Sequence, residues 1–94
     1  MQIKWTRGAS RNLKQVEEYI AQDNPRAAEK TVLKILKSVE LLADQPAMGR
    51  VGRTVDTREL VVSGTPYIVP YRVKEGHIQI LRIFHGAMRW RDSL

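Results

Sequence analysis

The sequence predicts a single α+β domain in which an antiparallel pair of helices packs on one face of a small antiparallel β-sheet. In the first half of the chain, apolar residues recur every three or four positions, which is the period of amphipathic helices. In the second half, β-branched and alternating runs are separated by glycine and proline, which is typical of strands. Because 94 residues enclose one core only, residues 1–94 are expected to form one domain.

The N-terminal part is expected to form a strand followed by a helix. Apolar Ile3 and Trp5 alternate with polar neighbours, which predicts a strand over Gln2 to Thr6. From Ala9 to Gln22 the apolar positions follow helical spacing, so this range is predicted to be the first helix.

A second helix is predicted to begin at Pro25. Asn24 can cap free amide groups, and proline suits the first position of a helix. The apolar stripe that follows predicts that the helix continues to about Asp44 and packs antiparallel to the first. Gln45 to Asp56 lacks a period and contains two glycines, so it is expected to be a surface loop.

The remaining residues predict a three-stranded meander, which the N-terminal strand should join. The expected strands are Arg58 to Ser63, Tyr67 to Lys74 and His77 to Phe84. Pro70 cannot donate a ladder hydrogen bond, so it predicts a bulge or an edge, and we assign no two-residue hairpin register at Glu75-Gly76. The helices should cover one sheet face and leave the other open.

The composition favours a binding partner that is acidic or polyanionic. Sixteen Lys and Arg against ten Asp and Glu give a formal net charge of +6, although charge for solubility alone is an alternative. The absence of cysteine and of a metal-ligand cluster predicts that no metal or other cofactor takes part. Without an apolar signal or membrane segment, the expected compartment is the cytoplasm.

The candidate catalytic residues are His85, Arg82 and Arg72. A neutral imidazole could move a proton at an RNA 2′-hydroxyl while the arginines hold the phosphate, and the alternative for His85 is a cap at the end of a strand. Strand alternation places Arg72 on the face of Ile68 and Pro70. It places Arg82 on the face of Ile80 and Phe84. Each arginine could point across the open face to a phosphate or pair with a carboxylate such as that of Glu59.

Other basic and aromatic residues are candidates for binding a target or nucleic acid. They are Arg50 and Arg53 in the loop, Arg58 at a strand start, and Arg89, Trp90 and Arg91 near the C-terminus. Arg58 could instead form a local ion pair with Glu59, and Trp90 could fold back onto the sheet. Tyr67 and Tyr71 share a strand face and could either reach a phosphate or be half-buried.

Several linked motifs resemble the RelE/ParE superfamily of toxins over nearly the whole chain. The motifs are Asn24-Pro25-Arg26-Ala27-Ala28, Gln45-Pro46-Ala47-Met48-Gly49-Arg50, Thr57-Arg58-Glu59-Leu60, Pro66-Tyr67-Ile68-Val69, Tyr71-Arg72-Val73 and Ile80-Leu81-Arg82-Ile83-Phe84-His85-Gly86. The resemblance implies a toxin of a type II toxin-antitoxin system that arrests growth until a cognate antitoxin binds it as a hetero-oligomer.

The resemblance implies two possible targets. ParE-like members poison DNA gyrase, whereas RelE-like members are metal-independent endoribonucleases that cut mRNA on the ribosome. RelE-like ribonucleases carry several lysines and arginines on the open face, and some relatives use a glutamate with an arginine and a histidine. This chain matches only part of those sets, through His85, Arg82 and Arg72. The long helix pair therefore favours gyrase, with mRNA as the alternative.

Overall fold

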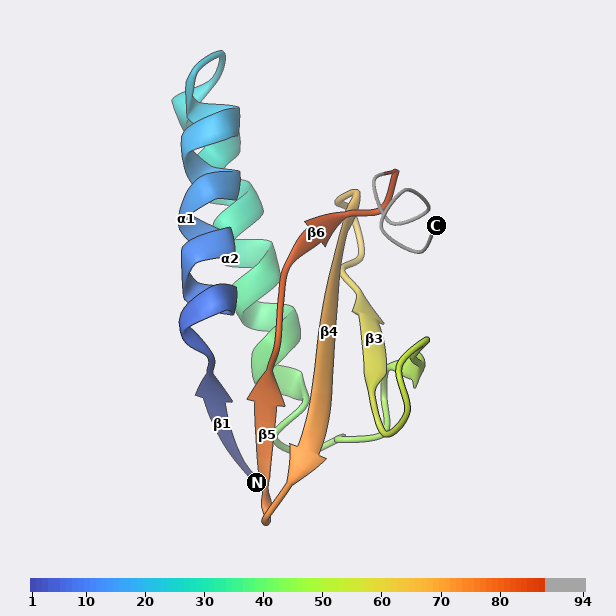
Figure 1. The fold of residues 1–94 in the computed structure, drawn as a ribbon. Coiled ribbons are helices and arrows are strands. Elements are labelled where there is room, and N and C mark those ends of the chain that lie inside the picture. The colour runs from blue at the N-terminus through green and yellow to red at the C-terminus, as the bar shows by residue number, and fades with distance from the viewer. Residues whose placement is uncertain (88–94) are drawn as a thin grey trace.

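The computed structural model describes residues 1–87, which form two helices beside a twisted sheet (Figure 1). The helices are α1 (Arg7–Ala21) and α2 (Pro25–Leu41). The strands are β1 (Gln2–Trp5), β2 (Arg50–Val51), β3 (Arg58–Val61), β4 (Tyr67–Lys74), β5 (His77–Ile80) and β6 (Phe84–His85). Their order is β1-β5-β4-β3-β2, and β6 also pairs with β4. This arrangement confirms the predicted α+β class.

The sheet is mixed rather than antiparallel as expected from the sequence. β1 runs parallel to β5, with Gln2 opposite His77, whereas the other pairs of strands are antiparallel. The chain reverses between α1 and α2, and again before β3, β4 and β5 (Figure 1). Because this number of reversals is even, β1 and β5 must point the same way.

Side-chain caps fix where both helices begin. Thr6 Oγ1 accepts a hydrogen bond from the Ala9 amide at 3.1 Å, so α1 starts before the predicted Ala9. Asn24 Oδ1 accepts from the Ala27 amide at 3.1 Å, which confirms the predicted cap of α2. Each such cap stabilises a helix by about 1 kcal/mol. Neither helix offers an apolar stretch of the length that crossing a bilayer requires within the described part of the chain.

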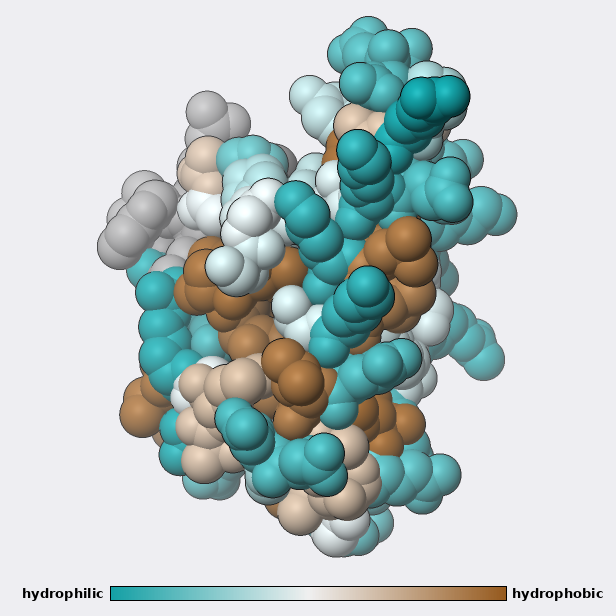
Figure 2. All heavy atoms as spheres, turned by 180° about the vertical axis from the view of Figure 1, so that it is seen from behind, coloured by the Kyte–Doolittle hydropathy of each residue, from teal (hydrophilic) through white to brown (hydrophobic). Residues whose placement is uncertain are grey.

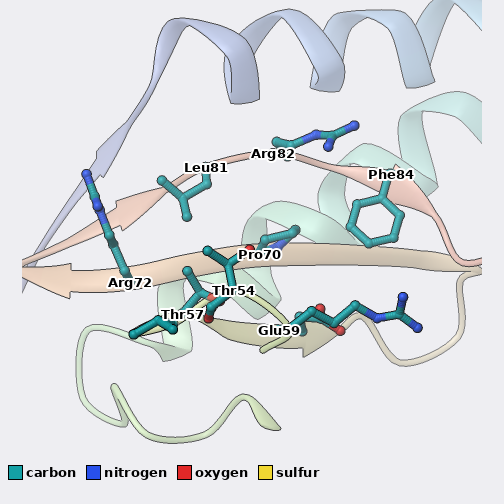
Figure 3. Close-up of a pocket in the computed structure, with 10 residues that line it drawn as sticks. Thr54, Thr57, Glu59, Pro70, Arg72, Leu81, Arg82 and Phe84 are labelled. Carbon is teal, nitrogen blue, oxygen red and sulfur yellow. The ribbon is translucent and has the colours of Figure 1, made fainter. Parts of the chain in front are cut away.

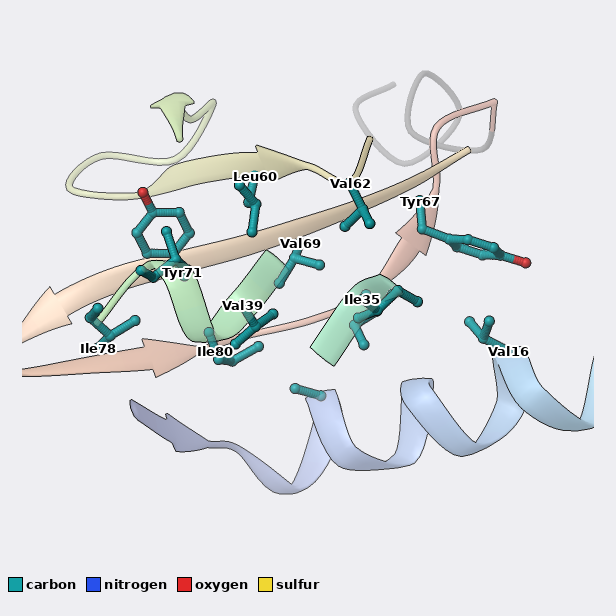
Figure 4. Packing of buried hydrophobic residues seen from close by; sticks show 13 residues of the cluster. Val16, Ile35, Val39, Leu60, Val62, Tyr67, Val69, Tyr71, Ile78 and Ile80 are labelled. Carbon is teal, nitrogen blue, oxygen red and sulfur yellow. The ribbon is translucent and has the colours of Figure 1, made fainter. Parts of the chain in front are cut away.

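The core lies between the two helices and one face of the sheet (Figure 4). Its fully buried side chains include Ile35 and Val39 from α2 and Val69 and Tyr71 from β4. Burying an aliphatic side chain of this size contributes roughly 1.5–3 kcal/mol. The helical stripe and the alternating strand residues therefore meet as their periods predict, and the helices leave the other face of the sheet uncovered.

Pro70 interrupts the pairing of β4 with its neighbour, as the sequence predicts. The register shifts by one residue between β5 and β6, so residues 69–70 lie opposite residues 81–83. The Leu81 amide donates to the Pro70 carbonyl at 2.9 Å, so the missing Pro70 donor faces this bulge. β4 is nevertheless a central strand, and the predicted strand from His77 to Phe84 is wrong because the bulge divides it.

Two short features differ from the sequence interpretation. Glu75 and Gly76 form a two-residue hairpin turn with φ angles of 53° and 76°, and Lys74 pairs with His77. The two-residue hairpin register at Glu75-Gly76, which the sequence left undecided because of Pro70, therefore does form. The expected loop from Gln45 to Asp56 contains β2, whose two residues are too few to show a period.

Candidate functional site on the open face

The open face is the side of the sheet that the helices do not cover. Along β4, Tyr67, Val69 and Tyr71 are part of the core, so Pro70 and Arg72 point away from the helices. The predicted placement of Arg72 beside Pro70 is therefore confirmed. Leu60 of β3 also faces the core, which places its neighbour Glu59 on the open face.

A cavity of about 370 Å³, here called the arginine pocket, lies between the open face and the segment that follows β2 (Figure 3). Its lining residues are Arg53, Thr54, Val55, Thr57, Glu59, Pro70, Arg72, Leu81, Arg82 and Phe84. The pocket brings predicted site residues Arg53, Arg72 and Arg82 together. The lining thus combines three arginines with two threonines and one aromatic residue, and arginine and hydroxyl side chains are donors that anionic ligands accept from.

Glu59 is a buried carboxylate of the arginine pocket, only 5% exposed. Arg50 Nη2 lies 3.2 Å from its Oε1, and that arginine side chain is 48% exposed. A carboxylate removed from water needs such a charged hydrogen bond to offset the hydration that it loses. Arg50 therefore lies in strand β2 and pairs with a carboxylate of the sheet, whereas the sequence predicted a loop residue. The pair could not be predicted because β2 itself was not.

Arg72 and Arg82 have different partners on the open face. Arg72 Nε donates to Gln79 Oε1 at 2.6 Å, so its observed partner is an amide rather than the carboxylate considered from the sequence. The Arg82 guanidinium lies 5.8 Å from the centroid of the Phe84 ring, a cation–π contact. The predicted placement of Arg82 with Phe84 is confirmed, but its predicted placement with Ile80 is wrong, because Ile80 belongs to the core and the bulge at residues 81–83 separates the two.

Arg58 supports the segment between α2 and β3. Its Nη1 donates to the Gly49 carbonyl at 2.8 Å and to the Ala47 carbonyl at 3.4 Å. Arg58 and Glu59 are adjacent in β3 and therefore point to opposite faces. The predicted local ion pair between them is wrong, and the contacts of Arg58 are those of a structural residue.

Tyr71 holds the same segment from within the core. Its hydroxyl donates to the Pro46 carbonyl at 2.7 Å and accepts from the Gly49 amide at 2.8 Å. A Cβ at Gly49 would lie 2.6 Å from the Tyr71 ring, so only glycine fits there. Burial raises the pKa of the Tyr71 hydroxyl, while the Gly49 hydrogen bond and the Arg58 charge oppose the rise. Tyr67 and Tyr71 share a face as predicted, but that face is the core.

His85 lies in a second cavity on the helix side of the sheet, here called the histidine groove. This groove of about 560 Å³ runs between α1 and β6, and Val16, Tyr19 and Tyr67 are among its lining residues. The His85 ring makes an edge contact with Tyr67, with 5.6 Å between centroids. Its Nδ1 accepts the Ala87 amide at 3.1 Å, in agreement with the strand-cap interpretation.

The candidate catalytic set is thus divided between two cavities. Arg72 lines the arginine pocket, His85 lines the histidine groove, and Arg82 lines both. Among residues 1–87, no group of three or more His, Asp or Glu is placed to hold a metal ion. The remaining candidates Arg89, Trp90 and Arg91 lie outside the described residues.

Sequence reasoning missed several members of the arginine pocket. Thr54 and Thr57 lie in the predicted loop, and Gln79 is the partner of Arg72 from the neighbouring strand. Gln79 was within reach of prediction, because a two-residue turn at Glu75-Gly76 places it opposite Arg72. Nothing in the local sequence marks the threonines.

The helix pair on one face of a mixed sheet matches the fold of solved toxin-antitoxin structures of the RelE/ParE superfamily. The structure is similar to that of a chromosomal ParDE toxin-antitoxin system from P. aeruginosa, with a TM-score of 0.81 and 34% identity over 90% of this chain and 95% of that one. The toxin-antitoxin complex RelBE2 from Mycobacterium tuberculosis shares the fold, with a TM-score of 0.66 and 22% identity over 89% and 95% of the two chains.

Sequence comparison places the chain within one family of that superfamily. Residues 3–90 match the family described as the ParE toxin of the type II toxin-antitoxin system parDE. The chain therefore belongs to the ParE toxin family. It is 43% identical to Y4kP of Sinorhizobium fredii over 98% of this chain and 95% of that protein. It is 38% identical to the toxin RelE2 of Caulobacter vibrioides, over 92% and 96% respectively.

Proposed function

We propose that this ParE-family toxin arrests growth by inhibiting DNA gyrase and that a cognate antitoxin neutralises it. The observation that carries the proposal is the match to the ParE family over residues 3–90, supported by the similarity to a ParDE system. The net charge of +6 suits both an enzyme engaged on DNA and an acidic antitoxin. The complex would be a hetero-oligomer in the cytoplasm.

The division of the candidate catalytic residues supports a binding mechanism over a cleaving one. General acid–base catalysis requires the proton-transfer group and the phosphate-binding cations to reach the same reacting atoms. His85 and Arg72 line different cavities, Arg82 is the catalytic candidate that lines both, and His85 Nδ1 already accepts a backbone amide. The toxin would therefore act by occupying its target and not by breaking a bond.

Exposed cations would make the contacts with gyrase or its DNA. Arg53 lines the arginine pocket and is exposed, and Arg89, Trp90 and Arg91 follow β6 in the sequence. Arg50 and Arg58 would act indirectly, because their contacts with Glu59 and with the Gly49 carbonyl hold the segment that carries Arg53. The gyrase-binding surface would thus combine this segment with the C-terminal residues.

The proposal is tested by adding the purified protein to a gyrase supercoiling assay and measuring supercoiled product and cleaved DNA complexes. We expect the protein to abolish supercoiling. We expect Arg53→Glu to weaken this inhibition roughly tenfold, because the substitution reverses a charge at the proposed contact. Lys14→Glu on α1 makes the same charge change away from the pocket and should inhibit normally. Undisturbed supercoiling at concentrations that stop growth would overturn the proposal.

The second candidate is a ribosome-dependent mRNA endoribonuclease, favoured by the 38% identity to the toxin RelE2. In that case Arg72, Arg82 and His85 would act at the scissile phosphate. The two candidates separate when DNA synthesis and translation are followed after induction of the toxin. Gyrase inhibition should stop DNA synthesis first, whereas mRNA cleavage should stop translation first and produce cuts at codon-dependent positions.

A further inference from the structure

Six polar residues form a continuous surface on the open face, over strands β1, β5 and β4, which lie side by side (Figure 1). Core residues alternate with them along each strand, so their side chains point away from the helices. This surface, here called the polar platform, consists of Gln2, Lys4, Arg72, Lys74, His77 and Gln79. It carries three lysine or arginine side chains and no carboxylate. The rear view, from the side of the helices, shows apolar patches between hydrophilic side chains (Figure 2).

The strand register arranges the platform in two rows. In one row Lys4 lies opposite Gln79, and Gln79 lies opposite Arg72. The other three platform residues form a second row two positions along the strands, which ends at Lys74. Neighbouring strands are about 4.8 Å apart, and residues two apart along a strand are separated by about 6.6 Å. The backbones of the three cationic residues therefore lie within roughly 12 Å of one another.

The cations of the platform are available to a ligand in two different ways. Arg72 Nε donates to Gln79 Oε1 at 2.6 Å, and its side chain extends toward β5 (Figure 3). This bond fixes the guanidinium group and leaves its Nη1 and Nη2 atoms for another acceptor. Lys4 and Lys74 are exposed, and no ion pair within residues 1–87 holds either ammonium group.

The chemistry of the platform favours the phosphate backbone of a nucleic-acid duplex. Lysine and arginine side chains that neutralise phosphates bind without regard to base sequence. Proteins that bind single strands also use aromatic side chains on which bases stack, and the platform has no phenylalanine, tyrosine or tryptophan. A protein partner would need an apolar centre in the interface, which the platform also lacks. A duplex presents its phosphates outward, so a flat array of donors reaches them without unstacking a base.

We infer that the polar platform binds the phosphate backbone of duplex DNA without reading its sequence. Lys4, Arg72 and Lys74 each donate to one phosphate, and Gln79 is a positioning residue that orients Arg72. The inference rests on the proposed function for the source of the duplex, which is the DNA that gyrase engages. The toxin then contacts this DNA directly, and not only the enzyme that holds it.

The inference is tested by fluorescence anisotropy of a short labelled DNA duplex titrated with the full chain, without gyrase, at several salt concentrations. Three neutralised phosphates predict that log K falls with log salt concentration with a slope of at least about −2.7. Lys4→Gln and Lys74→Gln should each make the slope shallower by about 0.9, whereas Lys14→Gln on α1 should leave it unchanged. Absence of duplex binding, or equal slopes in Lys4→Gln and Lys14→Gln, would overturn the inference. So would tighter binding of a single strand of DNA or RNA than of the duplex.

Two opposite substitutions at Gln79 keep the test independent of folding. Gln79→Glu pairs with Arg72 and adds a negative charge to the platform, so it should weaken duplex binding at least tenfold. Gln79→Lys adds a cation and should strengthen binding and steepen the slope by about 0.9, which a misfolded chain could not do. Weaker binding by both variants would contradict a phosphate contact at this position.

Gyrase assays on the same protein separate this inference from the proposed function. A chain that inhibits supercoiling but does not bind the free duplex overturns the platform and leaves the gyrase proposal in place. A chain that binds the duplex with the expected slope but leaves supercoiling undisturbed supports the platform and overturns the gyrase proposal.

Discussion

The two faces of the sheet have different chemistry and different energetic roles. The helix-covered face is closed by aliphatic and aromatic residues such as Ile35, Val69 and Tyr71, which are fully buried. The open face carries Arg72, Gln79 and Glu59, whose contacts are specific hydrogen bonds and an ion pair. Stability is therefore concentrated on the covered face, while the open face holds charged groups in defined positions.

This difference determines what a substitution can do. Hydrophobic burial is non-directional and grows with the area removed from water, so losing one core side chain weakens the whole fold. Exposed or half-exposed ion pairs contribute little to stability, because water and salt screen them. Substitutions on the covered face should thus change the free energy of unfolding, and substitutions on the open face should mainly change binding.

The largest expected effect belongs to the covered face. Ile35→Ala removes a fully buried side chain between the helices and the sheet, and should destabilise the protein by about 2–5 kcal/mol. Val55→Ala truncates an aliphatic lining residue of the arginine pocket that is 83% exposed, and should cost less than about 1 kcal/mol. Urea unfolding of both variants measures the difference. Equal costs would contradict the division between the faces.

Tyr71 joins the core to the segment that leads into β2. Tyr71→Phe keeps the ring but leaves the Pro46 carbonyl and the Gly49 amide without their partner, which should cost about 1–3 kcal/mol. Chemical denaturation measures this cost. A variant as stable as the parent would show that water replaces the hydroxyl at both backbone groups.

The same residue predicts how stability depends on pH. Burial raises the pKa of folded Tyr71 above its ordinary value of 10.0, while an unfolded tyrosine keeps that value. The contribution of the protonated Tyr71 hydroxyl to the free energy of unfolding is therefore fully present below pH 10.0. It is lost as the pH rises from 10.0 through the pKa of folded Tyr71. The free energy of unfolding, measured from neutral to alkaline pH, should fall less steeply in Tyr71→Phe. An identical slope in the two proteins would contradict this assignment.

A smaller effect is expected from Arg58, on which the same segment also depends. Arg58→Gln removes charged donation to the Gly49 and Ala47 carbonyls and should destabilise the fold by roughly 1 kcal/mol, since one contact is long and solvent screens the charge. Hydrogen exchange in residues 45–57 should increase more than exchange in the helices. A uniform increase throughout the chain would contradict a local role.

Sequence alone was enough for the covered face and only partly enough for the open face. Helical and strand periods located the core because burial follows periodicity, and alternation placed Arg72 correctly. Arg82 lies with Phe84 as predicted but not with Ile80, because the one-residue bulge opposite Pro70 shifts every later side chain relative to β5. The Arg50–Glu59 pair could not be predicted, because it depends on β2, a strand of two residues held by distant contacts with Tyr71 and Arg58.

The smallest effect is expected from His85, the residue that most directly separates binding from catalysis. His85→Ala removes an acceptor for the Ala87 amide and an edge contact with Tyr67, both on the helix side of the sheet. Growth arrest and gyrase inhibition should therefore change less than about twofold, because neither contact faces the arginine pocket. Single-turnover cleavage of ribosome-bound mRNA provides the opposing measurement. A rate slowed by about 10²–10⁴ would instead identify His85 as a general acid or base and favour the ribonuclease.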